Sequence, residues 1–174
     1  MVVGKGLIGK AFDDYSNFDE VLIYCSGVSN STSVSMAEYD RELELLEQNI
    51  HKHPEKKFIY FSTCSIYDPS MNESTYVKHK LSIENYIQHH VKRYNIFRLS
   101  NLVGATSNNF TITNYLYHSI LHQTPIEIWQ NAYRNLIDID DPWENYTLST
   151  MGLLAELIDP GINNVSYVRT LMLL

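Results

Sequence analysis

Residues 57–63, KFIYFST, form a continuous apolar run that ends in two hydroxyl side chains. A run of this length without polar alternation is typical of a strand that is buried on both faces of a sheet. Similar runs precede and follow it in the chain, EVLIYCSG at 20–27 and NIFRLSN at 95–101. These runs predict the centre of a parallel sheet.

Helical patterns separate the predicted strands. Residues 35–52 place Met36, Tyr39, Leu43, Leu46 and Ile50 at helical spacing, and residues 75–94 indicate a second long helix. Further elements are expected as a strand at 1–4, helices at 5–15, 108–123 and 141–158, and strands at 126–129, 135–140 and 163–168. The alternation predicts an α/β fold, a doubly wound parallel sheet flanked by helices, in a single domain over residues 1–174.

Composition excludes several classes of function. The chain has 174 residues, a formal net charge of −7 and no run of Lys and Arg, so binding to nucleic acid or to an anionic membrane is not expected. No apolar stretch reaches the roughly 18 residues that a spanning helix needs. Gly4, Lys5 and Gly6 interrupt the start where a signal peptide would be apolar, so we expect a cytoplasmic protein with Cys25 and Cys64 reduced. No metal site is predicted, because the helical pair His118 and His122 lacks an acidic partner.

Residues 4–9, GKGLIG, match the pattern G-x-G-x-x-G between a strand and a helix. In dinucleotide-binding loops these glycines allow a tight turn, close approach of the backbone to a pyrophosphate, and packing of the helix. A plain glycine turn is the alternative, since the pattern is weak by itself. We therefore assign Gly4, Gly6, Leu7, Ile8 and Gly9 as candidate cofactor-binding residues.

Two further segments carry groups suited to catalysis. Ser62 and Thr63 end a predicted parallel strand, where α/β proteins bind ligands, although strand-end hydroxyls also cap turns. Tyr76 and Lys80 are four residues apart and share a helix face. An ammonium near a phenol lowers its pKa, which would make Tyr76 usable as a general acid or base nearer neutral pH. The alternative is an incidental pair, because the chain has 13 tyrosines.

Taken in order, these segments resemble the extended short-chain dehydrogenase/reductase superfamily, in its NAD-dependent sugar epimerase/dehydratase branch. The resemblance covers roughly residues 1–168. STCSIY at 62–67 resembles the strand end Ser-Ser/Thr-x-x-Val-Tyr, and YVKHKLSIE at 76–84 resembles Tyr-x-x-x-Lys-x-x-x-Glu. The remaining matches are FRLSNLVG at 97–104, RNLIDIDD at 134–141 and VLIYCSGVS at 21–29.

The resemblance implies a Rossmann-like fold, a cofactor that is NAD or NADP, and a nucleotide-sugar substrate. It implies that Thr63 bonds the reacting sugar oxygen, Tyr76 is the general acid/base, and Lys80 holds the nicotinamide ribose and tunes Tyr76. Ser26 and Gly27 would line the cofactor cleft. Ser62, Asn101 and Arg134 would contact the substrate.

The chain departs from the family in its first half. Only residues 10–20 separate Gly9 from Val21, whereas the family normally has a second strand, a helix and a third strand there. That part usually carries the charged residue that reads the adenosine ribose, and none follows Cys25 and Ser26. An alternative alignment makes VLIYCSG the second strand, but SGVS fits the nicotinamide side better. The substrate loop at 68–75 and the C-terminal substrate lobe are also reduced.

Two hypotheses follow. The first is a compact NAD(P)-dependent nucleotide-sugar epimerase, dehydratase or ketoreductase of polysaccharide or nucleotide-sugar metabolism. The second is a non-catalytic Rossmann-fold binding or assembly module that has lost cofactor binding. Because the missing segment leaves the first strand at a sheet edge, a homodimer through that edge is a corollary of both.

Overall fold

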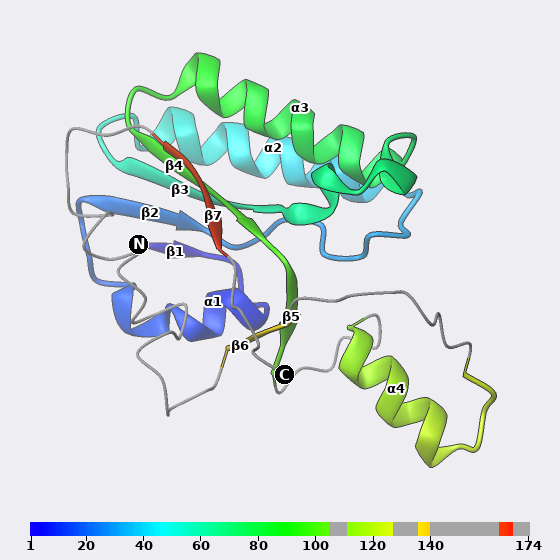
Figure 1. Ribbon diagram of the computed structural model, residues 1–174. Coiled ribbons are helices and arrows are strands. Elements are labelled where there is room, and N and C mark those ends of the chain that lie inside the picture. Colours follow the sequence, from blue (N-terminus) through cyan, green and yellow to red (C-terminus); the bar gives the residue numbers. More distant parts are fainter. Residues whose placement is uncertain (105–110, 127–135, 140–163, 169–174) are drawn as a thin grey trace.

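The computed structural model describes residues 1–104, 111–126, 136–139 and 164–168. Its main sheet is parallel and has the strand order β1-β2-β3-β4-β7 (Figure 1). The strands are β1 (Val2–Val3), β2 (Val21–Tyr24), β3 (Lys57–Thr63), β4 (Tyr94–Leu99) and β7 (Asn164–Val168). The prediction of a parallel α/β sheet is therefore confirmed.

Helices cover both faces of this sheet. The short helix α1 (Leu7–Ala11) and the 3-10 turn η1 (Asp13–Tyr15) pack on one face, while α2 (Met36–Lys52) and α3 (Thr75–His90) pack on the other (Figure 1). Alternate residues of each strand point to opposite faces of the sheet. Because helices cover both faces, the residues on each face are apolar, and the strand sequences are continuous hydrophobic runs. Ile59 and Phe61 of β3 face α1, whereas Phe58 and Tyr60 face α2 and α3.

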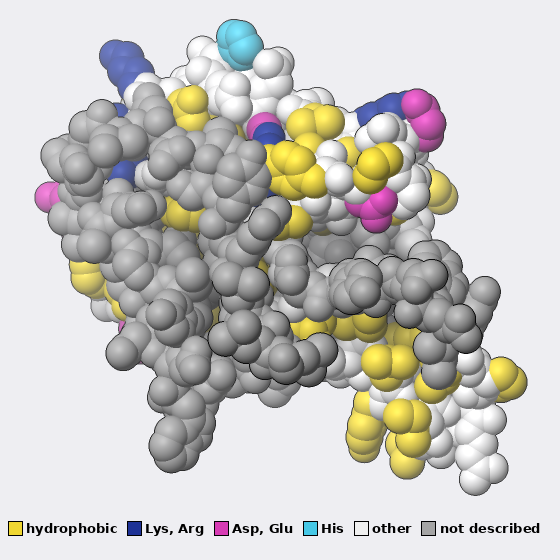
Figure 2. Space-filling model, in the orientation of Figure 1, with side chains coloured by type: hydrophobic (Ala, Val, Ile, Leu, Met, Phe, Trp, Pro, Cys, Tyr) yellow, Lys and Arg dark blue, Asp and Glu magenta, His cyan; other side chains and the backbone are white. Residues whose placement is uncertain are grey.

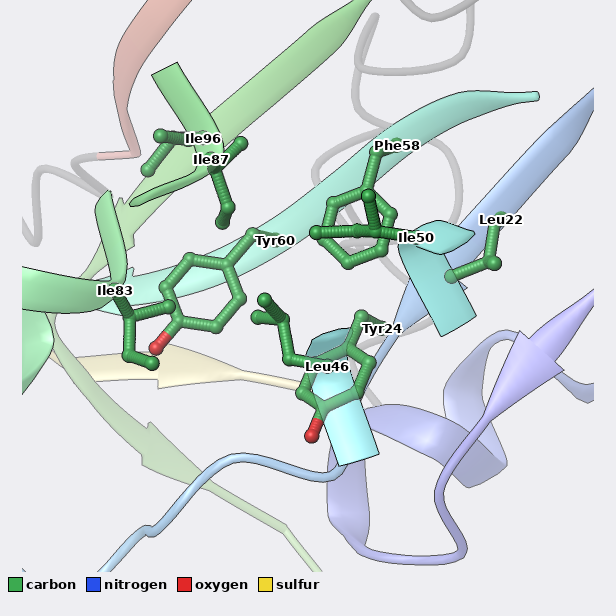
Figure 3. Close-up of a cluster of buried hydrophobic side chains, with 9 residues drawn as sticks. All are labelled: Leu22, Tyr24, Leu46, Ile50, Phe58, Tyr60, Ile83, Ile87 and Ile96. Atoms are coloured by element: carbon green, nitrogen blue, oxygen red, sulfur yellow. The ribbon is translucent and has the colours of Figure 1, made fainter. Parts of the chain in front are cut away.

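The core beneath α2 and α3 is built from residues at helical and strand spacing. Leu46 and Ile50 of α2 and Ile83 and Ile87 of α3 meet the even-numbered side chains of the strands (Figure 3). Tyr60 and Tyr24 lie in this cluster with almost no exposed surface. Their hydroxyls bond to helix α2, with Tyr60 donating to the side chain of Glu42 and Tyr24 to its carbonyl. The two tyrosines thus connect this apolar core to the polar groups of Glu42.

The strand order decides between the two alignments of VLIYCSG. In the doubly wound order 3-2-1-4-5-6, the fourth strand lies beside the first strand on the side opposite the second. Here β2 lies between β1 and β3, and β4 lies beyond β3. The segment VLIYCSG therefore occupies the position of the fourth strand in that order, and not of the second. Among the described strands, β1 lies at one end of the sheet, as the shortened first half predicts.

The connections on either side of β2 differ in hand. Both β1–α1–β2 and β2–α2–β3 advance in the same direction across parallel strands, yet α1 and α2 lie on opposite faces. Exchanging the face of the connection exchanges its hand. One of the two is therefore a left-handed crossover, which is rare in parallel sheets. This is the geometry expected when an internal strand–helix–strand segment is lost between β1 and β2.

The remaining described elements lie beyond the carboxyl end of β4. Strand β5 (Asn101–Val103) pairs in parallel with β6 (Leu136–Asp138), and α4 (Ile112–Leu121) follows Thr111, whose side chain caps the helix. Figure 2 shows hydrophobic side chains at the surface over α4. The predicted helix at 75–94 ends at His90 because Tyr94 already pairs in β4. The predicted strand at 126–129 and helix at 141–158 lie outside the described residues.

Candidate functional site

A cleft of about 810 Å³ lies at the carboxyl ends of the central strands. This is the edge where open α/β sheets bind ligands. Its walls come from the glycine loop, the segment after β2, the end of β3, helix α3 and the start of β5. Cleft-lining residues that the sequence predicted as site residues are Gly6, Leu7, Ile8, Gly27, Ser62, Thr63, Tyr76, Lys80 and Asn101.

The three glycines of the loop do different things. Gly4 has φ +118°, and a Cβ there would lie 2.7 Å from the backbone of Cys25. A Cβ on Gly9 would collide with the carbonyl of Gly4. A Cβ on Gly6, in contrast, would meet nothing within 4 Å and Gly6 lines the cleft. Gly4 and Gly9 therefore shape the turn, while Gly6 leaves space that a ligand can fill against the backbone.

The segment after β2 is held by helix α2. Arg41 donates from Nη1 to Ser26 Oγ at 3.2 Å and from Nη2 to the carbonyl of Ser26 at 3.1 Å. The amide of Val28 donates to the carboxylate of Glu42 at 2.6 Å. Gly27 lies between these anchors, and a Cβ on it would be 2.7 Å from Lys80 Nζ. Glycine is therefore required at this position if Lys80 is to keep its place.

Thr63 and Tyr76 both line the cleft, and both are almost fully buried there. The pKa of Tyr76 is raised by burial to about 12, with Thr63 acting in the opposite direction and Glu42 and Tyr39 adding to the rise. Tyr76 is consequently a neutral phenol at pH 7 and a weaker acid than a free tyrosine.

Lys80 does not lower the pKa of Tyr76, contrary to the prediction. Its Nζ donates to Glu42 Oε1 at 2.9 Å and to the Tyr60 hydroxyl at 3.0 Å. The same nitrogen lies 5.8 Å from the centroid of the Tyr76 ring. The ammonium of Lys80 is thus paired with the carboxylate of Glu42, which the sequence did not indicate. Burial is the largest influence on the pKa of Tyr76.

The predicted substrate residues have different positions. Ser62 is buried, and its Oγ has no hydrogen-bond partner among the described residues. A buried hydroxyl without a partner costs about 1–3 kcal/mol, so a ligand that bonded it would recover part of that cost. Asn101 lies in β5 at the edge of the cleft. Arg134 lies outside the described residues.

Two other motif residues hold the scaffold. Arg98 of β4 donates to both carboxylate oxygens of Glu84, from Nε at 2.9 Å and from Nη2 at 2.5 Å. Nη1 of the same guanidinium donates to the hydroxyl of Tyr67. This bidentate pair joins the strand end at 67, the Tyr-x-x-x-Lys-x-x-x-Glu helix and the Arg-Leu strand. It explains structurally why these segments occur together.

Glu42 and Arg41 are the residues that sequence reasoning missed. Glu42 follows Tyr39 by three residues and precedes Leu46 by four, so it lies on the apolar stripe of its helix. A carboxylate among the apolar residues of a helix could have indicated a buried, functional Glu42. Nothing in the sequence distinguished Arg41, because a single exposed basic residue on a helix is ordinary.

The cleft has features that fit a nicotinamide dinucleotide. Gly6 leaves open backbone, Ser62 offers an unpaired hydroxyl, and the volume suits a cofactor-sized ligand. Over the described residues, no cluster of three or more His, Cys, Asp and Glu is arranged to hold a metal ion. Within the same part of the chain, no helix is both long and apolar enough to cross a membrane.

A comparison with models of protein families agrees with this reading of the site. Residues 4–148 match the model described as the NAD dependent epimerase/dehydratase family. The chain belongs to this family. The matched residues include the glycine loop, Thr63, Tyr76 and Lys80, and the membership confirms the family indicated by the sequence motifs. A search of curated protein sequences finds no match.

Solved structures with the same fold are longer than this chain. A UDP-glucose 4-epimerase aligns with TM-score 0.62 and 18% identity over 96% of this chain and 62% of its own. MoeE5 in complex with UDP-glucose and NAD aligns with TM-score 0.66 and 15% identity over 97% and 62%. A dTDP-glucose 4,6-dehydratase from Bacillus anthracis in complex with NAD aligns with TM-score 0.61 and 15% identity over 94% and 55%. The chain therefore spans less than two thirds of these proteins and shares their fold.

Proposed function

We propose that this chain is a compact NAD(P)-dependent enzyme of nucleotide-sugar metabolism, an epimerase, dehydratase or ketoreductase. The observation that carries the proposal is the convergence of Thr63, Tyr76 and Lys80 in one cleft with the glycine loop. The family membership and the NAD-bound neighbours of the same fold support it. A cytoplasmic location is part of the proposal.

Each residue has a distinct role in the proposed reaction. The nicotinamide, when bound, supplies the hydride exchange with a sugar carbon. Tyr76 donates its phenolic proton to the sugar oxygen as a carbonyl becomes an alcohol, and it recovers the proton in the reverse direction. Thr63 orients that oxygen through its hydroxyl, and Ser62 offers a second hydrogen bond. Lys80 presents its ammonium to the hydroxyls of the nicotinamide ribose.

Gly6 approaches the pyrophosphate in this proposal, with Leu7 and Ile8 beside it, while Gly4 and Gly9 shape the turn that presents it. Ser26 and Gly27 lie along the ribose and nicotinamide. The raised pKa of Tyr76 keeps the phenol protonated at pH 7, so a proton is present there for transfer, although burial makes the phenol a weaker acid than a free tyrosine.

Calorimetric titration with NAD⁺, NADH, NADP⁺ and NADPH tests the proposal. We expect micromolar binding of at least one of them, weakened at least tenfold by Lys80→Ala. Lys78→Ala is the matched control, because Lys78 is an exposed lysine on the same helix that pairs with Glu73. Absence of binding for all four at millimolar concentration would reject the proposal. It would favour a non-catalytic module. The position of β1 at one end of the described sheet is consistent with that alternative.

A second measurement addresses catalysis. In Tyr76→Phe, which retains the ring and removes the proton donor, we expect cofactor affinity within about twofold of the wild type. Reduction of a 4-keto nucleotide sugar, followed through the consumption of NADH or NADPH, should fall by at least 100-fold. Equal rates in both proteins would remove Tyr76 from the mechanism.

A further inference from the structure

Glu42 is a completely buried carboxylate with every bonding direction in use. Oε1 accepts from the Tyr60 hydroxyl at 2.7 Å and from Lys80 Nζ at 2.9 Å. Oε2 accepts from the Val28 amide at 2.6 Å and lies 3.1 Å from His79 Nε2. Its residue exposure is 0%. An ionised carboxylate in such a place persists only when it is bonded and paired, as this one is.

Lys80 has one N–H donor that is not used in its bonds to Glu42 and Tyr60. An ammonium has three donors, and the bonds to Glu42 and Tyr60 use two of them. Lys80 lines the cleft, although only 2% of its surface is exposed. The two fixed bonds orient the third donor, so a ligand in the cleft meets an ammonium that has already lost its rotational freedom.

Gly27 packs against this pair and leaves room for it because it has no side chain. A Cβ on Gly27 would lie 2.7 Å from Lys80 Nζ and 3.0 Å from Glu42 Oε1. The backbone of the segment after β2 therefore passes directly over the ion pair. The Val28 amide is bonded to the same carboxylate, so one side chain fixes both the lysine and the segment that covers it.

Glu42 also sustains the charge of Lys80. Burial lowers the pKa of Lys80, and the Glu42 carboxylate is the largest influence that raises it. Burial raises the pKa of Glu42, but Lys80, His79, Val28 and Tyr60 together bring it to about 2. The other titratable or charged groups around the pair are Tyr39 and Arg41 on α2, Tyr24 on β2, Tyr60 on β3, and Tyr76, His79 and Glu84 on α3.

We propose that Glu42 is a positioning residue that keeps the Lys80 ammonium charged and aimed at the ribose hydroxyls of a nicotinamide nucleotide. The identity of the ligand rests on the proposed function. The state of Lys80 does not, because it is a property of the protein without any ligand. The inference therefore separates into two parts that are measured independently.

The first measurement is an NMR titration of Lys80 in protein labelled at lysine, without nucleotide. The signal is assigned by its loss in Lys80→Arg. In Glu42→Gln, which keeps the shape and removes the charge, we expect the Lys80 pKa to fall by at least about one unit relative to wild type. Glu44→Gln, an exposed position on the same helix, should leave it unchanged. An equal Lys80 titration in wild type and Glu42→Gln overturns the proposal.

The second measurement is nucleotide affinity over pH 6 to 10 in the same proteins. We expect Glu42→Gln to bind at least tenfold more weakly at pH 8 and to lose affinity at a lower pH than wild type, a displacement that a purely structural role would not cause. If wild type binds no nucleotide, the proposed function fails, while the Lys80 titration still decides the role of Glu42. If Glu42→Gln does not fold, Glu42→Asn, which also removes the charge, is titrated instead. A lowered Lys80 pKa supports the proposal and an unchanged one rejects it.

Discussion

Replacing Gly4 with alanine should destabilise the protein strongly, whereas the same change at Gly6 should not. Gly4 has φ +118°, where an alanine is strained by about 1–3 kcal/mol. Its Cβ would also lie within 2.7–2.9 Å of backbone atoms of Cys25 and Ser26, which cannot move without shifting β2. Overpacking of this kind costs about 1–3 kcal/mol. We therefore expect Gly4→Ala to lose about 3 kcal/mol of unfolding free energy.

Gly6 supplies the matched control for this prediction. It has φ −72° and ψ −169°, an extended conformation open to alanine, and no atom lies within 4 Å of its added Cβ. Gly6→Ala should therefore remain within about 0.5 kcal/mol of wild type. Its methyl group enters the cleft, so nucleotide affinity should fall although stability does not.

Urea unfolding followed by far-ultraviolet circular dichroism measures both variants. The expected result is a large shift of midpoint for Gly4→Ala and almost none for Gly6→Ala. A loss below about 1 kcal/mol in Gly4→Ala would refute the close approach of the loop to β2. Equal losses in the two variants would refute the division of roles between the glycines.

Two further predictions concern the ion pairs of Glu42 and Glu84. The pKa of Glu42, about 2, lies below its ordinary value of 4.5. This carboxylate therefore adds about 3 kcal/mol to the unfolding free energy above about pH 5, and that contribution is lost as the pH falls through 4.5 toward 2. Urea midpoints should therefore show that wild type and Glu42→Gln converge in acid, and a constant gap would contradict the sign. Arg98→Ala leaves Glu84 buried and unpaired, so thermal unfolding should reveal a loss of about 3 kcal/mol, with nucleotide affinity retained.

The sequence was sufficient for the elements whose pattern is local. The run at 57–63 became β3 with the predicted bounds, because Lys57 is followed by four apolar and two hydroxyl residues, a run too short for a buried helix. Motif order also predicted that the glycine loop, Thr63 and Tyr76 would contribute to one cleft. The partner of Lys80 did not, because it comes from α2, 38 residues earlier, and contact at that separation is set by how two helices pack on one sheet face.

The direction of the Tyr76 pKa was wrong for the same reason. Spacing places Lys80 one turn from Tyr76, but spacing does not show where the ammonium points. In the fold, Glu42 and Tyr60 draw it under Gly27, and the ring of Tyr76 rather than its hydroxyl faces the charge. A four-residue motif fixes which residues share a helix face, and the tertiary packing fixes their electrostatics.

The hand of the crossovers links the shortened first half to the retained site. Connections between parallel strands of one sheet are expected to be right-handed, since left-handed connections are rare. The opposite hands on either side of β2 are explained if α1 kept its original face while the segment between it and β2 was lost. In the family that the chain resembles, such a segment usually carries the residue that reads adenosine, whereas the elements that carry or precede Gly27, Thr63 and Lys80, namely β2, β3 and α3, are present here. If less ligand surface is available for binding, pre-orientation of the remaining groups matters more, and the contacts of Glu42 with Val28, Tyr60, His79 and Lys80 provide it.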